Sequence, residues 1–162
     1  MNTALESMAA RLRLRAPENE KLRLTFCFAC ALRVQHLLEQ EPAKGCLAVL
    51  GRYLDGQADR EELENARRIS ERLANAHQGS ASIDGCGHAA VSATYAVAKA
   101  LGGNAIDAAS YAAYAYVYAQ SGYAAVADLD SFLAEHAWQV SVLEGLAPKE
   151  PAIPDHNRGV DA

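Results

Sequence analysis

Cysteine and histidine side chains are the first candidates for chemistry in this chain of 162 residues. Cys27 and Cys30 form a Cys-x-x-Cys motif, and Cys86 and His88 lie in a second short motif. Together these four side chains would complete the ligand set of a tetrahedral zinc site. The first pair lies in a strongly apolar stretch, however, where cysteine usually packs as a small hydrophobic residue. Reduced, buried thiols are therefore the favoured interpretation, and a metal- or ligand-binding helical bundle is the alternative.

The second motif does not predict catalysis. Asp84, Cys86 and His88 could be imagined as orienting acid, nucleophile and base, but residues two positions apart do not face each other on a helix. Residues 85–90 also match the spacing of a dinucleotide-binding loop, which needs a preceding strand that the sequence does not predict. We therefore expect a protein that is not an enzyme and that needs no cofactor.

Acidic residues in one expected helix could contact another protein. Glu61, Glu62 and Glu64 lie on its polar side. Such residues most often form a solvated surface, and a docking patch that steers a basic partner is the functional alternative.

Aromatic residues form a second candidate contact surface. Tyr111, Tyr114 and Tyr118 have the spacing i, i+3, i+7 and fall on one helix face. A tyrosine stripe lines a core more often than an interface, but tyrosine and tryptophan are also enriched among interface hot spots. Trp138 lies off the main apolar stripe of its own helix, so it either packs in a second layer or anchors a partner.

Arg33 is a charged residue within the most apolar expected helix. Such a side chain must either extend to solvent or pair with a carboxylate. Asp84, Asp107 and Glu135 are the candidate partners, and we predict a structural ion pair.

Helix signals and breaks divide the chain into an all-α, single alanine-rich bundle of six or seven helices. The expected helices cover residues 2–15, 18–40, 43–54, 59–77, 84–101, 104–121 and 124–146. The second is apolar nearly all round and should be central. The last has an apolar stripe formed by Leu129, Phe132, Leu133, His136, Val140 and Leu143. Residues 1–147 should form the domain, and the proline-rich residues 148–162 should form a flexible tail.

Composition indicates the packing and the compartment. Residues 81–127 hold 17 alanines in 47 positions, so their helices should be slim and closely packed. The N-terminus has no apolar leader, and the uncharged residues 108–127 are too polar to insert into a bilayer. A net charge of −5 does not favour nucleic acid or an anionic membrane. We expect a soluble cytoplasmic protein.

Two segments, combined in a fixed order, resemble a known family. They are residues 30–39 (Cys-Ala-Leu-Arg-Val-Gln-His-Leu-Leu-Glu) and residues 135–146 (Glu-His-Ala-Trp-Gln-Val-Ser-Val-Leu-Glu-Gly-Leu). An alanine-rich block that begins Gly-His-Ala-Ala at residue 87 lies between them. In this order the chain resembles bacterial immunity proteins of the all-helical immunity-protein-five-like group, over residues 24–146.

The resemblance implies interbacterial competition by polymorphic toxins. An immunity protein binds its cognate toxin domain in the cytoplasm of the producer and inhibits it stoichiometrically. A basic nuclease is the toxin class that suits an acidic inhibitor. Glu61, Glu62, Glu64, Tyr111, Tyr114, Tyr118 and Trp138 are then the candidate toxin-binding residues. A homodimer that pairs the tyrosine faces is a further alternative.

Overall fold

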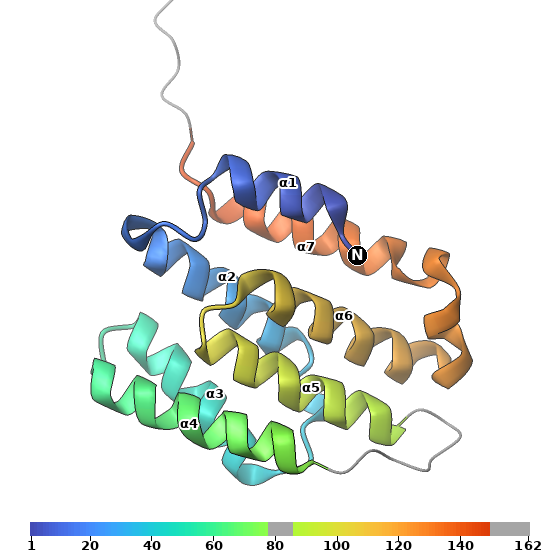
Figure 1. Ribbon diagram of the computed structural model, residues 1–162, viewed down its shortest axis with the longest axis horizontal. Coiled ribbons are helices and arrows are strands. Elements are labelled where there is room, and N and C mark those ends of the chain that lie inside the picture. The colour runs from blue at the N-terminus through green and yellow to red at the C-terminus, as the bar shows by residue number, and fades with distance from the viewer. Residues whose placement is uncertain (78–85, 150–162) are drawn as a thin grey trace, which may run out of the picture.

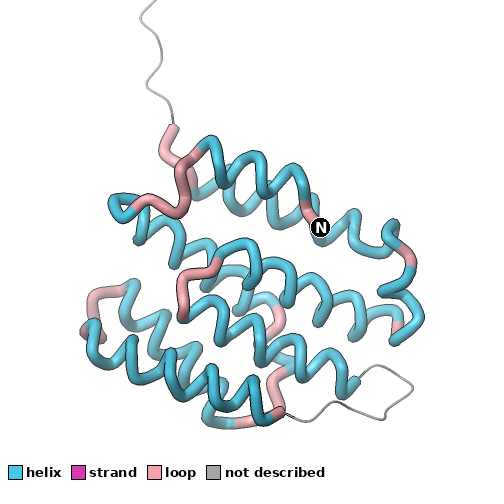
Figure 2. Tube along the Cα trace, viewed as in Figure 1, coloured by secondary structure: helices cyan, strands magenta, loops and turns pink. Residues whose placement is uncertain are grey.

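The structure is a computed structural model that describes residues 1–77 and 86–149. These ranges contain seven α-helices and no strand (Figure 2), which confirms the all-α prediction. The α-helices are α1 (Thr3–Arg11), α2 (Glu20–Arg33), α3 (Glu41–Leu54), α4 (Arg60–Ala76), α5 (Cys86–Leu101), α6 (Ala105–Ser121) and α7 (Leu133–Leu146). Short 3-10 helices connect some of them: η1 (Pro17–Asn19), η2 (Gln35–Leu37), η3 (Tyr123–Ala127) and η4 (Leu129–Phe132).

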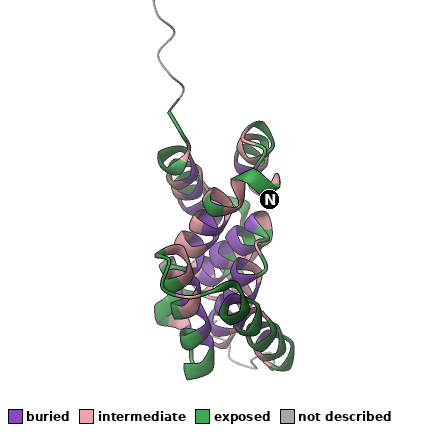
Figure 3. Cartoon of the chain, turned by 90° about the vertical axis from the view of Figure 1, so that its left-hand side faces the viewer, coloured by how far each residue is buried: buried purple, intermediate pink, exposed green. Residues whose placement is uncertain are grey.

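The helices stack as layers around α2 (Figure 1). α1 lies beside α7 at one edge, and α3 packs against α4 at the opposite edge. α2 contacts α3, α5, α6 and α7, so it is central, as its apolar sequence predicts. Seen from the side, buried residues gather on the inward-facing sides of the helices (Figure 3).

Alanine forms the contact between α5 and α6, which is the most extensive helix pair of the described residues. Buried alanines recur every three or four residues, at Ala89, Ala93, Ala96 and Ala100 of α5 and at Ala105, Ala108, Ala112 and Ala115 of α6. Small side chains on both faces let the two backbones approach closely, and dispersion contacts then replace bulky packing. The alanine-rich sequence therefore specifies a close helix pair.

Substituting Ala112 by leucine tests this close approach. The site is 0% exposed, so the added methylenes must displace neighbouring atoms. We expect the free energy of unfolding to fall by about 1–3 kcal/mol. Urea denaturation measures the change, and Ala48→Leu on the exposed side of α3 is the matched control, expected to stay within about 0.5 kcal/mol of the wild type. Equal stability of the two variants would show that α5 and α6 are loosely packed.

The start of α4 agrees with the sequence in detail. Asp59 Oδ1 accepts a hydrogen bond from the Glu62 N–H at 2.8 Å, and Glu62 Oε2 accepts one from the Asp59 N–H at 3.0 Å. This reciprocal capping box satisfies two amide groups that the helix leaves unpaired. The Glu62 carboxylate therefore faces its own backbone.

The first helix is shorter than predicted, because α1 ends at Arg11 and not at Arg15. Arg13 adopts a positive φ of 51°, and the Leu14 N–H donates to the Ala9 carbonyl across the turn. Glycine usually occupies this position of a helix-terminating turn. The sequence gives no signal for the turn because arginine stands there instead.

The second predicted helix is also too long. α2 ends at Arg33, and η2 follows before α3 starts at Glu41. We predict a break at residues 41–42 because proline interrupts helices. In the structure, Pro42 lies in the first turn of α3. Proline is compatible with that position because its missing N–H would have no partner within the helix.

The last helix begins nine residues later than predicted, at Leu133 and not at residue 124. The preceding residues form η3 and η4. A 3-10 helix turns about 120° per residue where an α-helix turns about 100°, so side chains in the two forms point in different directions.

The predicted apolar stripe of this helix is right for Phe132, Val140 and Leu143, which pack inward, and wrong for Leu129 and Leu133. α7 buries Glu135, Gln139 and Leu143, while Leu129 is 77% exposed and Leu133 is 62% exposed. Gln139 Nε2 donates to the Ala109 carbonyl at 2.7 Å, which satisfies its buried amide. Polar side chains with partners on other helices thus attach α7 to the bundle.

Candidate functional site

A row of five rings crosses the bundle at the C-terminal end of α6. His88 stacks on Tyr118 with 5.3 Å between ring centroids, and Tyr118 lies 6.3 Å from Tyr114. Tyr114 meets Phe132 edge to face at 5.2 Å, and Phe132 lies 5.6 Å from His136. This aromatic row joins α5, α6, η4 and α7. Such ring geometries are favourable and hold the side chains in defined orientations.

The row opens to solvent beside Phe132. Phe132 itself is buried, in a small cluster with Ala113 and Val117. Tyr114 above it is 41% exposed, and Leu129 and Leu133 on either side of it in the chain are more exposed still. We call Tyr114, Leu129 and Leu133 the α6–α7 patch. Grouped apolar side chains on a surface mark interaction sites, whereas single ones do not.

Carboxylates border this patch. Asp128 and Asp130 flank Leu129 and are both exposed. Asp128 Oδ1 accepts a hydrogen bond from the Asp130 N–H at 3.0 Å, which fixes the start of η4. Residues 100–148 contain five carboxylates and no lysine or arginine, so this stretch carries a charge equal to the formal net charge of −5 for the whole chain. Two of these carboxylates are paired with cations from elsewhere in the chain, Glu135 with Arg33 and Asp107 with Lys99, whereas none of the ion pairs among the described residues includes Asp128 or Asp130.

Sequence reasoning missed Leu129, Leu133, Asp128 and Asp130 as surface residues. The signal that could have revealed them is the sequence Asp-Leu-Asp directly before a helix, since aspartate there favours a cap.

Arg33 forms the ion pair expected of it, with Glu135. Its Nε donates to both carboxylate oxygens of Glu135, at 3.0 and 2.9 Å. The guanidinium also lies between two rings, 4.7 Å from the centroid of Tyr116 and 4.2 Å from that of Trp138. Burial raises the pKa of Glu135, and the hydrogen bond from Arg33 offsets part of the rise. The cluster thereby links α2, α6 and α7.

Two predicted contact residues lie away from the α6–α7 patch. Trp138 is half-buried and covers Arg33. Tyr111 is half-buried and stacks on Tyr95 of α5, with 5.0 Å between ring centroids. Of the three tyrosines predicted to share a face, Tyr114 is the one that the structure exposes most.

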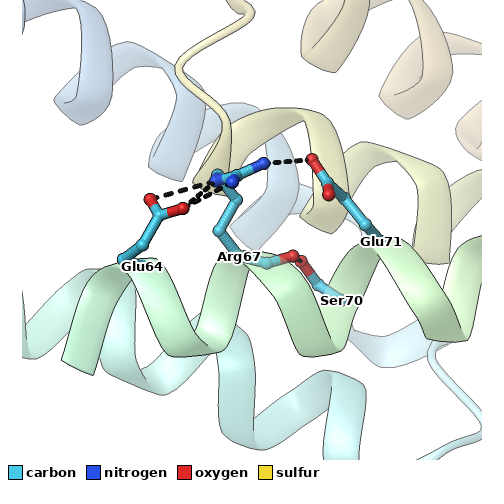
Figure 4. A network of polar contacts seen from close by, with 4 residues as sticks. All are labelled: Glu64, Arg67, Ser70 and Glu71. Atoms are coloured by element: carbon cyan, nitrogen blue, oxygen red, sulfur yellow. Dashed lines mark hydrogen bonds and ion pairs between the residues drawn. The ribbon is translucent and has the colours of Figure 1, made fainter. Parts of the chain in front are cut away.

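The predicted acidic patch of α4 is compensated by arginine. Figure 4 shows Arg67 between Glu64 and Glu71, and it hydrogen-bonds both carboxylates. The hydrogen bond from Arg67 lowers the pKa of Glu64. Glu62 is occupied by the capping box. Glu61 has neither that contact nor an ion pair among the described residues.

The α4 carboxylates and the tyrosines lie at different ends of the bundle. Glu64 lines a cavity of about 360 Å³ together with Gly102 and Gly103, just before α6 begins. Tyr118 is 13 residues into α6 from Ala105, which corresponds to about 20 Å at 1.5 Å per residue. The structure therefore does not bring the two predicted surfaces together.

A larger cavity of about 1140 Å³ lies at the same end as Glu64. Arg23 lines both cavities, and its Nη1 donates to the carbonyls of Leu14 at 2.8 Å and Ala16 at 3.2 Å. Arg13, also in the larger cavity, pairs with Glu18 at 3.5 Å. Both cations are therefore occupied by contacts within or beside the loop that follows α1.

The cysteines of the first motif are core residues. Cys27 and Cys30 are 0% exposed in α2. Burial raises the pKa of Cys27 to about 12 and raises that of Cys30 as well, so both thiols stay protonated at neutral pH. Among the described residues no three histidine, cysteine, aspartate or glutamate side chains form a group that could hold a metal ion. The Cys86 side chain and Asp84 lie outside the described residues.

No protein-family model, curated protein or solved structure matches the chain. None of the described helices combines the length and the apolar character needed to cross a membrane. A function must therefore be inferred from the arrangement of the described side chains.

Proposed function

We propose that the chain is an immunity protein that binds a cognate bacterial toxin domain and neutralises it by stoichiometric contact. The α6–α7 patch is the observation that carries the proposal, because it exposes a tyrosine in contact with a buried ring and two leucines that flank that ring in the chain. Aromatic anchors surrounded by apolar contacts are the usual source of affinity in protein interfaces. In this account the inhibitor acts in the cytoplasm of the producing cell.

The scaffold beneath the patch suits tight inhibition. Alanine packing holds α6 against α5, and Glu135 and Gln139 attach α7 through hydrogen bonds to other helices. A surface that is already ordered loses little conformational freedom when it binds, so more of the contact energy appears as affinity.

The two segments that resemble immunity proteins also meet in the fold. Arg33 belongs to the first segment, and Glu135 and Trp138 belong to the second. The resemblance therefore involves residues that pack together in the structure, although they are about 100 positions apart in the chain. Both segments therefore contribute to the region that presents α7.

Growth rescue tests the proposal. Expression of the protein encoded by the neighbouring open reading frame in a susceptible strain should arrest growth, and co-expression of this chain should restore it. The physical reason is that one inhibitor per toxin covers or distorts the toxin active site. Ile69→Ser, on the exposed side of α4, should protect as well as the wild type. Growth arrest that persists when both proteins accumulate equally would refute the function.

A further inference from the structure

We propose that the α6–α7 patch receives a cationic amphipathic segment of the partner, with apolar residues on one side and lysine or arginine on the other. This inference rests on the proposed function and names the chemistry of the partner at that same site.

The apolar side chains of the patch surround one aromatic ring. Leu129 begins η4, Leu133 begins α7, and Tyr114 of α6 contacts the ring of Phe132, which lies between the two leucines in the chain. We infer from this shared neighbour that the three exposed apolar side chains form a short strip. A strip of this kind fits one apolar side of a helix or an extended segment, whose anchors recur every three or four residues.

The charges around that strip favour a cationic partner. Asp128 and Asp130 border it, and neither takes part in an ion pair among the described residues. Burial lowers the pKa of His136 and the positive charge of the N-terminus lowers it further, so this ring at the end of the aromatic row is neutral at pH 7. An approaching cation is therefore attracted at this surface, and an approaching anion is repelled.

A second copy of the chain is a poor occupant of the patch. A symmetric dimer would bring Asp128 and Asp130 of one protomer close to the same residues of its partner. Neither carboxylate is paired with a cation among the described residues, and like charges in an interface oppose association. Charge complementarity thus favours a basic partner over self-association.

Two synthetic 14-residue helical peptides can serve as probes, one built of leucine and lysine and one built of leucine and glutamate. Titration calorimetry with the full chain should show binding of the lysine peptide and none of the glutamate peptide. The double variant Leu129→Ser/Leu133→Ser should weaken binding of the lysine peptide by about tenfold or more. Asp128→Asn/Asp130→Asn, which keeps oxygen acceptors at the start of η4, should weaken it about tenfold at low salt.

Glu61→Gln is the matched control, because it removes a carboxylate from α4 without touching the patch. Its binding of the lysine peptide should equal that of the wild type. Equal binding of the two peptides, or lysine-peptide binding that the patch variants leave unchanged, would overturn the inference. A doubled mass in light scattering that the leucine variant restores to the monomer would also overturn it, in favour of a second copy.

The probes distinguish this inference from the proposed function. If neither peptide binds but growth rescue persists and is lost in Leu129→Ser/Leu133→Ser, the partner chemistry is wrong and the function stands. If the lysine peptide binds at the patch but rescue fails, the patch recognises a basic partner and the toxin assignment is wrong.

Discussion

Replacing Glu135 by alanine should lower the free energy of unfolding by about 3 kcal/mol. The Glu135 side chain is 1% exposed, and it supplies the carboxylate for an arginine that is held between two rings. Its removal leaves the Arg33 charge without a partner and leaves a void beside α2. Because Arg33 is 29% exposed and keeps some contact with water, we expect a loss near the lower end of the range for broken buried pairs. Urea denaturation measures it.

A double variant separates the charge effect from the packing effect. Arg33→Met/Glu135→Leu removes both charges and keeps most of the volume, so it should lie within about 1 kcal/mol of the wild type. The two charges are coupled only if the double variant is more stable than the sum of single changes predicts. A double variant as unstable as that sum would show that the ion pair contributes nothing to the attachment of α7.

The raised pKa of Glu135 gives the same pair a pH dependence. A carboxyl whose pKa is higher in the folded state than in the unfolded state stabilises the fold fully below the unfolded pKa. That contribution is lost as the pH rises through the folded pKa. The stability of the wild type relative to Glu135→Gln, which does not titrate, should therefore be greater below about pH 4 than at about pH 7.

The second large effect is expected on binding. Leu129→Ser/Leu133→Ser should weaken the complex with the toxin domain by about 100-fold, which corresponds to about 2.7 kcal/mol. Both leucines are largely exposed, so the variant should unfold at the same urea concentration as the wild type. The loss of affinity would then come from the surface and not from the fold. Calorimetric titration of the purified proteins gives the dissociation constant.

Ile69→Ser is the control for this experiment, because it removes an exposed apolar side chain from α4. It should leave the dissociation constant unchanged within about twofold. If instead Ile69→Ser disrupts the complex and the leucine variant does not, the contact lies on the α4 side, where the predicted carboxylates Glu61, Glu62 and Glu64 stand.

Much of the fold follows from local signals in the sequence. The pair Asp59 and Glu62 predicts the start of α4, and it forms the expected capping box. Gly122 ends α6 with a φ of 78°, a conformation that glycine adopts without strain. Where the local signal is missing, as at Arg13, the predicted helix runs on past its true end.

Other features depend on partners that are distant in the sequence. The polar side of α7 is buried because Arg33 and Ala109 lie opposite Glu135 and Gln139. The spacing of residues within α7 cannot reveal these distant partners. It therefore predicts burial for Leu129 and Leu133, which the structure exposes. The 3-10 form of residues 123–132 adds to the error, because it places Leu129 outside the regular α-helical repeat.

The candidate site was predictable only in part. The spacing of Tyr114 and Tyr118 places both on one face of α6, and both enter the aromatic row. Their exposure depends on the rings that they contact, which are His88 of α5 for Tyr118 and Phe132 of η4 for Tyr114. The positions of these two rings are known only from the tertiary structure. The pairing of Glu64 with Arg67 is a local feature, because the two residues are three positions apart on the same helix.

Light scattering of a mixture of this chain and the purified toxin domain encoded by the neighbouring open reading frame tests the central claim most directly. The account predicts a single species with the summed mass of one copy of each protein. It also predicts that toxin activity falls to zero at one equivalent of inhibitor. Two separate masses, together with full toxin activity in the presence of excess inhibitor, would contradict the claim that this helical bundle is an immunity protein.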